Sequence, residues 1–341
     1  MKIGLISDAW LPQVNGVVRT LQNTARELTG MGHEVTVIGP DRFRTVPCPS
    51  YPEIRLSLLA GRRLAGIMES HAFDAIHIAT EGPLGLAARR WCRRHQQAFT
   101  TSYHTRFPEY IRLRAPIPLT ASYAWLRRFH GAASRTLVRT ATQREEMRQR
   151  GFQRLAVWPG GVDTGLFRPW GKAALDLPRP ISMYLGRIAP EKNLEAFLRL
   201  KLPGTQVLVG DGPSRAVLQQ RYPRAVFLGY RQGEELARTL AAADVFVFPS
   251  HTDTLGLVML EAMACGVPVA AFPVPGPQDV VRHGATGYLD HDLEQAVYHA
   301  LALDPEACID YANDYTWRRC TERFAELLTL ARPEMNAAAV G

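Results

Sequence analysis

The feature that most constrains the fold of this chain is an alternation of short apolar runs with helical patterns, which occurs twice. Buried runs of β-branched residues separated by helices predict a parallel sheet covered by helices. In the first half the predicted strands are 3–7, 34–38, 75–78 and 99–103, and the predicted helices lie near 15–31, 62–71 and 84–96.

The alternation stops at residues 159–180, which are dense in Gly and Pro and typical of a linker, and then begins again. The 341 residues therefore predict two doubly wound α/β domains, 1–162 and 163–314. Ligands of such sheets bind beyond the carboxyl ends of the strands. The predicted strands of the second domain are 181–186, 205–210, 225–229, 244–249 and 267–272.

Charge is distributed unevenly between the two halves of the chain. Residues 1–155 contain 23 Lys and Arg against 11 Asp and Glu, a net charge of +12, whereas the remaining residues carry a net charge of −4. A basic half indicates an anionic partner such as a membrane surface, a nucleic acid or an acidic ligand. The alternative is an arginine-rich surface that contacts only water.

The sequence also bears on the cellular compartment. No apolar run reaches the ~18 residues of a transmembrane helix, and the first residues, MKIGLISDAW, lack the pattern of a signal peptide. The five cysteines form no CxxC pair, which is typical of free thiols in a reducing compartment. We therefore expect a cytoplasmic protein.

Two carboxylates, Asp253 and Glu261, stand on either side of Gly256 in the segment SHTDTLGLVMLEAMACG. On one helix they would lie about 12 Å apart along the axis, whereas the paired carboxylates of a glycosidase need a separation of ~5–9.5 Å. A helix that begins near Gly256 presents backbone N–H groups, which bind anions, between the two acids. This order suits a sugar–diphosphate–ribose ligand. The alternative is a helix-start residue followed by an ordinary helix glutamate.

Other candidate residues follow predicted strands. Arg187 and Lys192 follow strand 181–186, where they are either ligands of a departing diphosphate or surface charges. Gly16 follows the first strand, and a glycine there lets the backbone approach a ligand closely. His104 lies at the end of the fourth strand, which favours a functional role over a structural one. The absence of a GxGxxG sequence argues against a dinucleotide site.

Together these groups resemble the motifs of the GT-B glycosyltransferases, specifically the retaining, nucleotide-sugar-dependent family 4. The spacing from Asp253 to Glu261 is similar to the E-x7-E motif of that family, with Asp in place of the first Glu. Arg187 and Lys192 are similar to its GR…K motif. The segments PGGVDTGLFRP, VGDGP and ATGYL also resemble family motifs, so the resemblance covers nearly the whole chain. It implies a C-terminal helix at about 315–332 that returns to the first domain.

The resemblance also implies roles for the site residues. Glu261 would hold the ribose hydroxyls, and Asp253 would hold hydroxyls of the donor sugar through a shorter side chain than the usual Glu. Arg187 and Lys192 would neutralise the diphosphate, and His104 would lie beside the reacting sugar, so the implied catalytic residues are His104, Arg187, Lys192 and Asp253. The other implied donor-binding residues are Gly16, Leu255, Gly256, Leu257, Tyr230 and Arg231, the last two beside the nucleobase.

The implied reaction is glycosyl transfer with retention, in which the diphosphate leaves from the face that the acceptor attacks. The first domain would bind the acceptor and the second the nucleotide-sugar, which is a co-substrate. The resemblance implies no metal and no other cofactor. The one DxD sequence, Asp290-His291-Asp292, is interpreted as a surface turn.

The sequences YHTRFPEY and VGDGP resemble those of bacterial synthases that glycosylate diacylglycerol. They also resemble those of GDP-mannose-dependent α-mannosyltransferases. Segment 110–135 mixes Tyr, Trp and Leu with five arginines, as an interfacial helix does, although a packed helix with a basic edge has the same composition. We expect a UDP-sugar donor, a lipid acceptor and peripheral contact with the anionic inner face of the cytoplasmic membrane. If the donor sugar is anionic, Arg106 or Arg19 would supply the cation near the sugar pocket.

The sequence leaves four alternatives to this function. The first is GDP-mannose-dependent transfer to a lipid or polysaccharide, and the second is an inactive nucleotide-sugar-binding protein. The third, a sugar-nucleotide epimerase, would need no acceptor. The fourth, a nucleic-acid-binding protein, explains the basic charge but none of the strand-end residues, so we expect no nucleic-acid partner.

Overall fold

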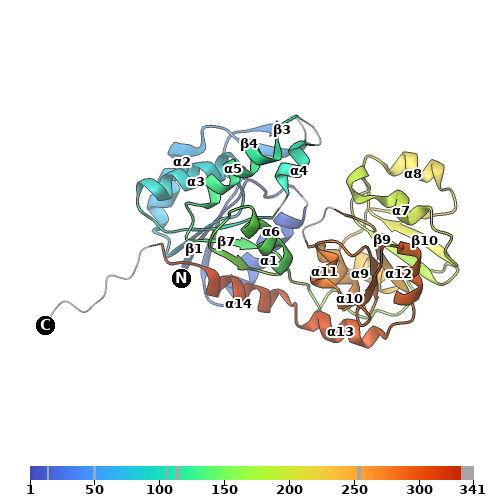
Figure 1. Ribbon diagram of the computed structural model, residues 1–341. Coiled ribbons are helices and arrows are strands. Elements are labelled where there is room, and N and C mark those ends of the chain that lie inside the picture. The colour runs from blue at the N-terminus through green and yellow to red at the C-terminus, as the bar shows by residue number, and fades with distance from the viewer. Residues whose placement is uncertain (14, 49–50, 105, 113–115, 252–254, 332–341) are drawn as a thin grey trace. The chain divides into compact units, whose positions relative to one another are not determined.

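The computed structural model describes residues 1–331 except 14, 49–50, 105, 113–115 and 252–254. The chain divides into two compact units (Figure 1). The first unit consists of Met1–Pro159 together with the chain from Cys320 onward, and the second consists of Gly160–Arg319. None of the helices in the described part is long and apolar enough to cross a membrane.

The first unit contains a six-stranded parallel sheet in the order β2-β1-β5-β6-β7-β8. Because β2 and β5 lie on opposite sides of β1, the strand order reverses there, which marks the usual ligand position of a doubly wound sheet. A separate antiparallel hairpin joins β3 (Thr45–Cys48) to β4 (Tyr51–Ser57). The sheet strands are β1 (Lys2–Ile6), β2 (Glu34–Ile38), β5 (Ala75–Ile78), β6 (Thr100–Ser102), β7 (Arg135–Val138) and β8 (Leu155–Val157).

Helices of the first unit bury their apolar faces on this sheet. Ile78 and Phe99 pack with Leu64 of α2, Leu84 of α3 and Phe129 of α5 in one core. The helices are α1 (Gly16–Gly30), α2 (Ala60–His71), α3 (Pro83–Arg94), α4 (Phe107–Arg112), α5 (Leu119–His130) and α6 (Ala141–Gln149).

The C-terminal helix α14 (Trp317–Leu327) brings the chain back to the first unit, as the sequence predicted. Its fully buried Phe324 lies 4.7 Å from the ring of Trp158 and 4.9 Å from the ring of His77. Beyond the helix, the amide of Ala331 donates to the carbonyl of Asp74, at the start of β5. The first unit is therefore assembled from both ends of the chain.

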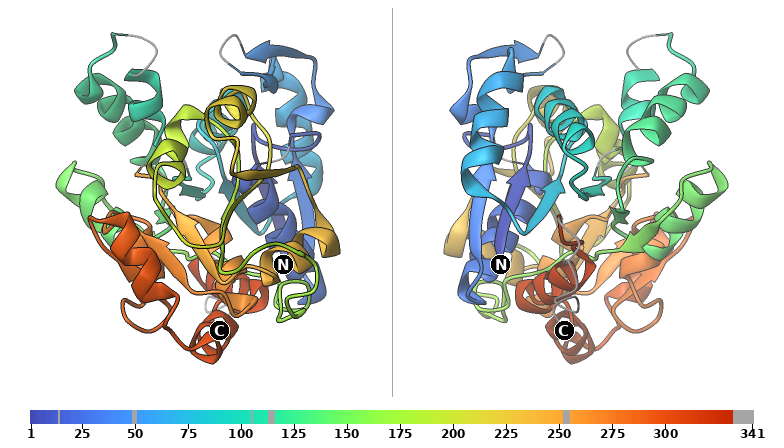
Figure 2. Two further views of the ribbon diagram at one scale, coloured as in Figure 1. Left: turned by 90° about the vertical axis from the view of Figure 1, so that its right-hand side faces the viewer. Right: turned by 90° about the vertical axis from the view of Figure 1, so that its left-hand side faces the viewer.

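The second unit contains a parallel sheet in the order β11-β10-β9-β12-β13-β14. Successive residues of its central strand face opposite sides: Met183 packs with α9 and α10, whereas Tyr184 packs with α7 and α12. Helices therefore cover both faces, which confirms the predicted doubly wound sheet (Figure 2). The strands are β9 (Ile181–Leu185), β10 (Thr205–Val209), β11 (Val226–Gly229), β12 (Val245–Phe248), β13 (Val269–Ala271) and β14 (Gly287–Leu289). The helices are α7 (Leu194–Leu198), α8 (Arg215–Arg221), α9 (Gly233–Ala241), α10 (Leu257–Ala264), α11 (Pro277–Val280), α12 (Leu293–Ala300) and α13 (Pro305–Asn313).

The apolar pattern of the sequence does not predict β3, β4, β7, β8 or β14. β8 and β14 are only three residues long, and a strand of this length gives an unreliable periodic signal, since the equally short β6 and β13 were predicted. Both strands of the hairpin contain a proline, which argues against a strand in the middle of a sheet but is tolerated in an isolated two-stranded ribbon.

Candidate functional site

Arg187, Lys192 and the start of helix α10 follow the two strands at which the strand order of the second unit reverses. β9 pairs with β10 on one side and with β12 on the other, so the loops after β9 and β12 emerge at neighbouring positions on the carboxyl edge. Arg187 and Lys192 lie on the first loop, and helix α10 follows the second. The side-chain amide of Asn193 donates to the carbonyl of Pro249 over 3.1 Å, which ties the two loops together.

Backbone contacts hold the loop that carries Arg187. The amide of Gly186 donates to Val209 over 3.0 Å, and the amide of Ile188 donates to Asp211 over 2.9 Å. Gly210 has a φ of +133°, and a Cβ atom on it would overlap the carbonyl oxygen of Gly186. The glycines of the VGDGP segment are thus needed for the close approach of two loops.

Helix α10 begins at the predicted position. Its N-cap is Gly256, with a φ of +73°, and within the described ranges no side chain caps its first N–H groups. Leu255 before it is buried, Leu257 is half-buried, and Glu261 in its second turn is 8% exposed. Exposed N–H groups at a helix start are an anion-binding arrangement. Asp253, the other carboxylate of the motif, lies outside the described residues.

The remaining predicted residues of this unit also follow strands. Tyr230 comes directly after β11 and is 57% exposed, and the adjacent Arg231 donates to the hydroxyl of Thr239. The DxD sequence is confirmed as a turn, since the carboxylate of Asp292 accepts from the amides of Glu294 and Gln295 and caps α12. No three His, Cys, Asp or Glu side chains of the described residues lie close enough to hold a metal ion.

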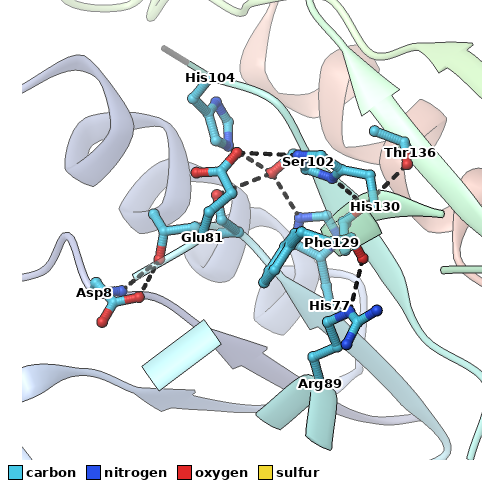
Figure 3. A network of polar contacts seen from close by, with 12 residues as sticks. Asp8, His77, Glu81, Arg89, Ser102, His104, Phe129, His130 and Thr136 are labelled. Carbon is cyan, nitrogen blue, oxygen red and sulfur yellow. Dashed lines mark hydrogen bonds and ion pairs between the residues drawn. The ribbon is translucent and has the colours of Figure 1, made fainter. Parts of the chain in front are cut away.

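In the first unit, His104 belongs to a row of hydrogen bonds that runs inward to the buried His77 (Figure 3). Its Nε2 atom lies 2.8 Å from the hydroxyl of Ser102, which lies 3.1 Å from Nε2 of His77. Nδ1 of His77 in turn lies 2.9 Å from the hydroxyl of Thr100. The donors and acceptors of these hydrogen bonds can be assigned in either direction. In both assignments each histidine ring carries a single proton.

Burial keeps both histidines of this row neutral. It lowers the pKa of His77 to about 3. It also lowers the pKa of His104 well below the usual range, and the charge of Arg139 adds to the effect. At neutral pH the imidazole of His104 is therefore a neutral hydrogen-bonding group that Ser102 holds in place.

A second buried network lies beside the first and contains residues that the sequence analysis missed. Glu81 follows β5, and its Oε1 lies 3.1 Å from Nε2 of His130, with both side chains buried (Figure 3). Nδ1 of His130 lies 2.9 Å from the hydroxyl of Thr101. The available signal for Glu81 was its position three residues after the predicted strand 75–78.

Asp8 at the end of β1 has a structural role. Its carboxylate accepts from the amides of Leu84 and Gly85 at the start of α3 and from the hydroxyl of Thr80. A Cβ atom on Gly82 would come within 2.5 Å of this carboxyl carbon, so only glycine fits there. Burial raises the pKa of Asp8, and these hydrogen bonds oppose the shift.

Gly16 differs from the other glycines at the strand ends. It is the first residue of α1, whose start is capped by the side chain of Asn15, which accepts from the amides of Val17 and Val18. A Cβ atom on Gly16 would meet nothing within 4 Å, so packing does not require glycine at this position. Arg106, one of the two arginines considered for an anionic sugar, forms an ion pair with Glu146 over 2.9 Å.

Comparison with known proteins identifies the family. Residues 14–166 match the model of Glycosyltransferase Family 4, and residues 179–303 match that of Glycosyl transferases group 1. A GDP-mannose-dependent alpha-mannosyltransferase of Mycobacterium tuberculosis is 32% identical to this chain, over 88% of both proteins. The chain belongs to glycosyltransferase family 4. Among other relatives of this family 4 member, Sulfoquinovosyl transferase SQD2 of Arabidopsis thaliana is 32% identical over 91% of the chain and 69% of its own length.

Solved structures agree on the fold. Sucrose-phosphate synthase from Thermosynechococcus elongatus superposes with a TM-score of 0.77 at 22% identity, over 96% of this chain and 98% of that one. Alr3699/HepE of Anabaena, in complex with UDP, superposes with a TM-score of 0.72 at 17% identity, over 96% and 99%. The family 4 protein is therefore a GT-B glycosyltransferase that uses a nucleotide-sugar.

Proposed function

We propose that the protein transfers a glycosyl group, with retention of configuration, from a UDP-sugar to a membrane lipid such as diacylglycerol. One observation carries the donor site: neighbouring strands β9 and β12 bring the loop of Arg187 and Lys192 and the start of α10 to one edge of the sheet. In this proposal the diphosphate contacts the two cations and the amides of Gly256 and Leu257. The ribose hydroxyls bind Glu261.

The proposed chemistry needs no protein nucleophile. The bond between the anomeric carbon and the diphosphate oxygen breaks, and the acceptor oxygen bonds to the same face of the sugar. The acceptor proton passes to the departing phosphate. Arg187 and Lys192 stabilise the leaving group, and a fixed donor of this kind contributes ~3 kcal/mol to catalysis. His104 is neutral at physiological pH and supplies a hydrogen bond near the sugar rather than a charge. Asp253 binds sugar hydroxyls, and Gly16 leaves room for the donor.

A lipid acceptor is supported by the character of the first unit. Residues 1–155 carry a net charge of +12. Helix α5 buries Tyr123, Leu126 and Phe129 but exposes Trp125 and Arg128. It is thus a packed helix whose outer edge combines an aromatic ring with a cation, as residues at a membrane interface do. We propose a peripheral position at the anionic inner face of the cytoplasmic membrane.

A second candidate donor is GDP-mannose. The relative from Mycobacterium tuberculosis and another from Mycolicibacterium smegmatis, 33% identical over 89% of both chains, are named GDP-mannose-dependent alpha-mannosyltransferases. Similarity over nearly the whole length favours a shared donor class.

The experiment that tests the proposal is lipid analysis of a bacterium that lacks glycosyl-diacylglycerols and expresses either the wild type or Glu261→Ala. We expect a new glycolipid from the wild type only, and its sugar then identifies the donor. In parallel, the purified protein is given UDP-glucose or GDP-mannose with diacylglycerol in detergent. Folded protein that makes no new lipid but transfers sugar to a soluble acceptor would refute the lipid acceptor and leave the glycosyltransferase activity standing.

A further inference from the structure

Five arginines from two helices line one pocket on the first unit. The arginine pocket has a volume of about 460 Å³. Helices α3 and α5, which lie side by side, provide all of its residues (Figure 1). They are Leu86, Arg89, Arg90, Arg93 and Arg94 of α3 and Arg128 of α5.

Arg89 is the half-buried arginine of this pocket. Its Nε donates to the carbonyl of Phe129 over 2.9 Å, and its Nη2 donates to the carbonyl of Arg128 over 2.6 Å. Its guanidinium also lies over the ring of Phe129, 5.9 Å from the centroid. Arg89 thus fastens α3, which carries Arg90, Arg93 and Arg94, to the C-terminal end of α5, which carries Arg128. Burial and the charges of Arg93 and Arg128 lower the pKa of Arg89.

The other four guanidinium groups are exposed, and none pairs with a carboxylate of the described residues. Some exposed arginines elsewhere in the chain do have acidic partners: Arg148 contacts Glu145 over 2.7 Å, and Arg323 contacts Glu326 over 2.8 Å. Like charges gathered without counter-charges repel one another, so a bound anion would relieve a local cost. Guanidinium groups bind phosphate oxygens in a bidentate manner.

Apolar side chains flank the same pocket. Leu86 on its wall is 37% exposed. Trp125, one turn before Arg128 on α5, is 46% exposed and stacks on Phe129 at a centroid distance of 6.0 Å. A soluble anion would use only the cations, whereas a lipid headgroup at an interface would use both kinds of side chain.

We propose that the arginine pocket binds the phosphate of an anionic phospholipid, with Leu86 and Trp125 entering the interface beside it. Residues from α3, outside the 110–135 segment that the sequence indicated, thus provide most of the membrane contact. The inference deepens the proposed lipid acceptor and rests on it for its biological meaning. Its test measures binding without donor or transfer, so the two can fail separately.

The test is sedimentation of the full chain with vesicles of phosphatidylcholine alone, or of equal parts phosphatidylcholine and phosphatidylglycerol. At about 0.15 M salt, where the Debye length is ~8 Å, charges far from the contact are screened. The variant Arg93→Gln/Arg128→Gln leaves Arg89 in place. The matched control, Arg44→Gln/Arg62→Gln, removes two exposed arginines of the same unit outside the pocket.

We expect binding to the mixed vesicles only. The pocket variant should lose about 30-fold in partition coefficient, since each arginine near an anionic surface contributes ~1 kcal/mol. The control pair should lose less than about threefold, and Trp125→Ser should weaken binding without changing its salt dependence. Unfolding curves that match the wild type keep the comparison valid.

Equal losses in the pocket variant and the control pair would overturn the inference, because net charge alone would then explain binding. Saturation of the wild-type pocket by soluble glycerol phosphate, with no preference for vesicles, would identify a site for free phosphate. If a single-stranded oligonucleotide displaces the protein from vesicles at a lower concentration than phosphatidylglycerol does, the pocket would be a nucleic-acid surface. Vesicle binding together with transfer only to soluble acceptors would support the pocket and refute the lipid acceptor.

Discussion

The two units hold their candidate residues by different means. In the second unit, main-chain hydrogen bonds between glycine-containing loops position Arg187, and a glycine N-cap starts the helix of Glu261. In the first unit, buried side chains on β5 and β6 position His104 through Ser102 and His77. Backbone hydrogen bonds tolerate most side-chain substitutions but not the replacement of a required glycine. A network of side-chain hydrogen bonds, in contrast, is broken when any one of its residues is replaced. Substitutions in the two units should therefore fail in different ways.

The largest effect is expected at Glu261. Glu261→Ala should lower kcat/KM about 1000-fold, because hydrogen bonds to a charged group contribute ~1.5–3 kcal/mol each and a ribose offers two hydroxyls. Steady-state kinetics with the donor varied measures this loss. Glu306→Ala, which removes an exposed glutamate of the same unit, is the control. Retention of more than about a tenth of wild-type kcat/KM, a loss below ~1.4 kcal/mol, would remove the role assigned to Glu261.

Gly210→Ala tests the backbone arrangement of the second unit. The added Cβ would overlap the carbonyl of Gly186 at a φ of +133°, so we expect a loss of ~3 kcal/mol or more in the free energy of unfolding. Urea denaturation measures it. Gly284→Ala also has a positive φ, +77°, but no neighbour within 4 Å, and should lose only about 1 kcal/mol. Similar losses in both variants would mean that loop packing contributes nothing beyond backbone strain.

The side-chain arrangement of the first unit should appear in the pH dependence of stability. The pKa of His77 is about 3 in the folded state and ~6.5 in the unfolded chain. Between these values only the unfolded state takes up the proton, so stability is complete above pH ~6.5 and declines toward pH 3. One such group contributes a slope of ~1.4 kcal/mol per pH unit.

His77→Gln keeps a hydrogen-bonding side chain but does not titrate. Its free energy of unfolding, measured by urea titration between pH 4 and pH 7, should depend on pH less steeply than that of the wild type, by about that slope. Parallel pH profiles for the two proteins would show that the imidazole of His77 takes up its proton in the folded state as readily as in the unfolded chain.

The smallest structural effect is expected at Gly16. Because a Cβ atom there meets nothing, Gly16→Ala should change the free energy of unfolding by no more than ~0.5 kcal/mol. If the donor approaches this backbone, kcat/KM should still fall roughly tenfold, a loss of ~1.4 kcal/mol in transition-state stabilisation. Unchanged kinetics would separate Gly16 from the donor site.

The contrast between the units also explains what the sequence could predict. The central strands of both sheets and the helix after Gly256 were predicted because apolar runs and glycines give local signals. The candidate residues of the second unit could be named from the sequence because they lie within short motifs, with Arg187 five residues before Lys192 and Asp253 eight before Glu261.

The hydrogen-bonded chain behind His104 has no such local signal. The register that pairs His77 with Thr100 sets it, although the two residues lie 23 positions apart. The pairing of Glu81 with His130 and the meeting of α3 with Arg128 likewise depend on tertiary packing. Sequence spacing shows none of these contacts, because each joins elements that are distant along the chain.

The return of α14 to the first unit has a consequence for how the protein matures. On the ribosome, residues 1–159 emerge first, but Phe324, which packs on Trp158 and His77, emerges only after the whole second unit. We therefore expect the contiguous second unit to reach its native state before the first, so that the order of folding is the reverse of the order of synthesis. A chain that stops short of α14 would expose the aromatic core that this helix covers and become a substrate for chaperones and proteases.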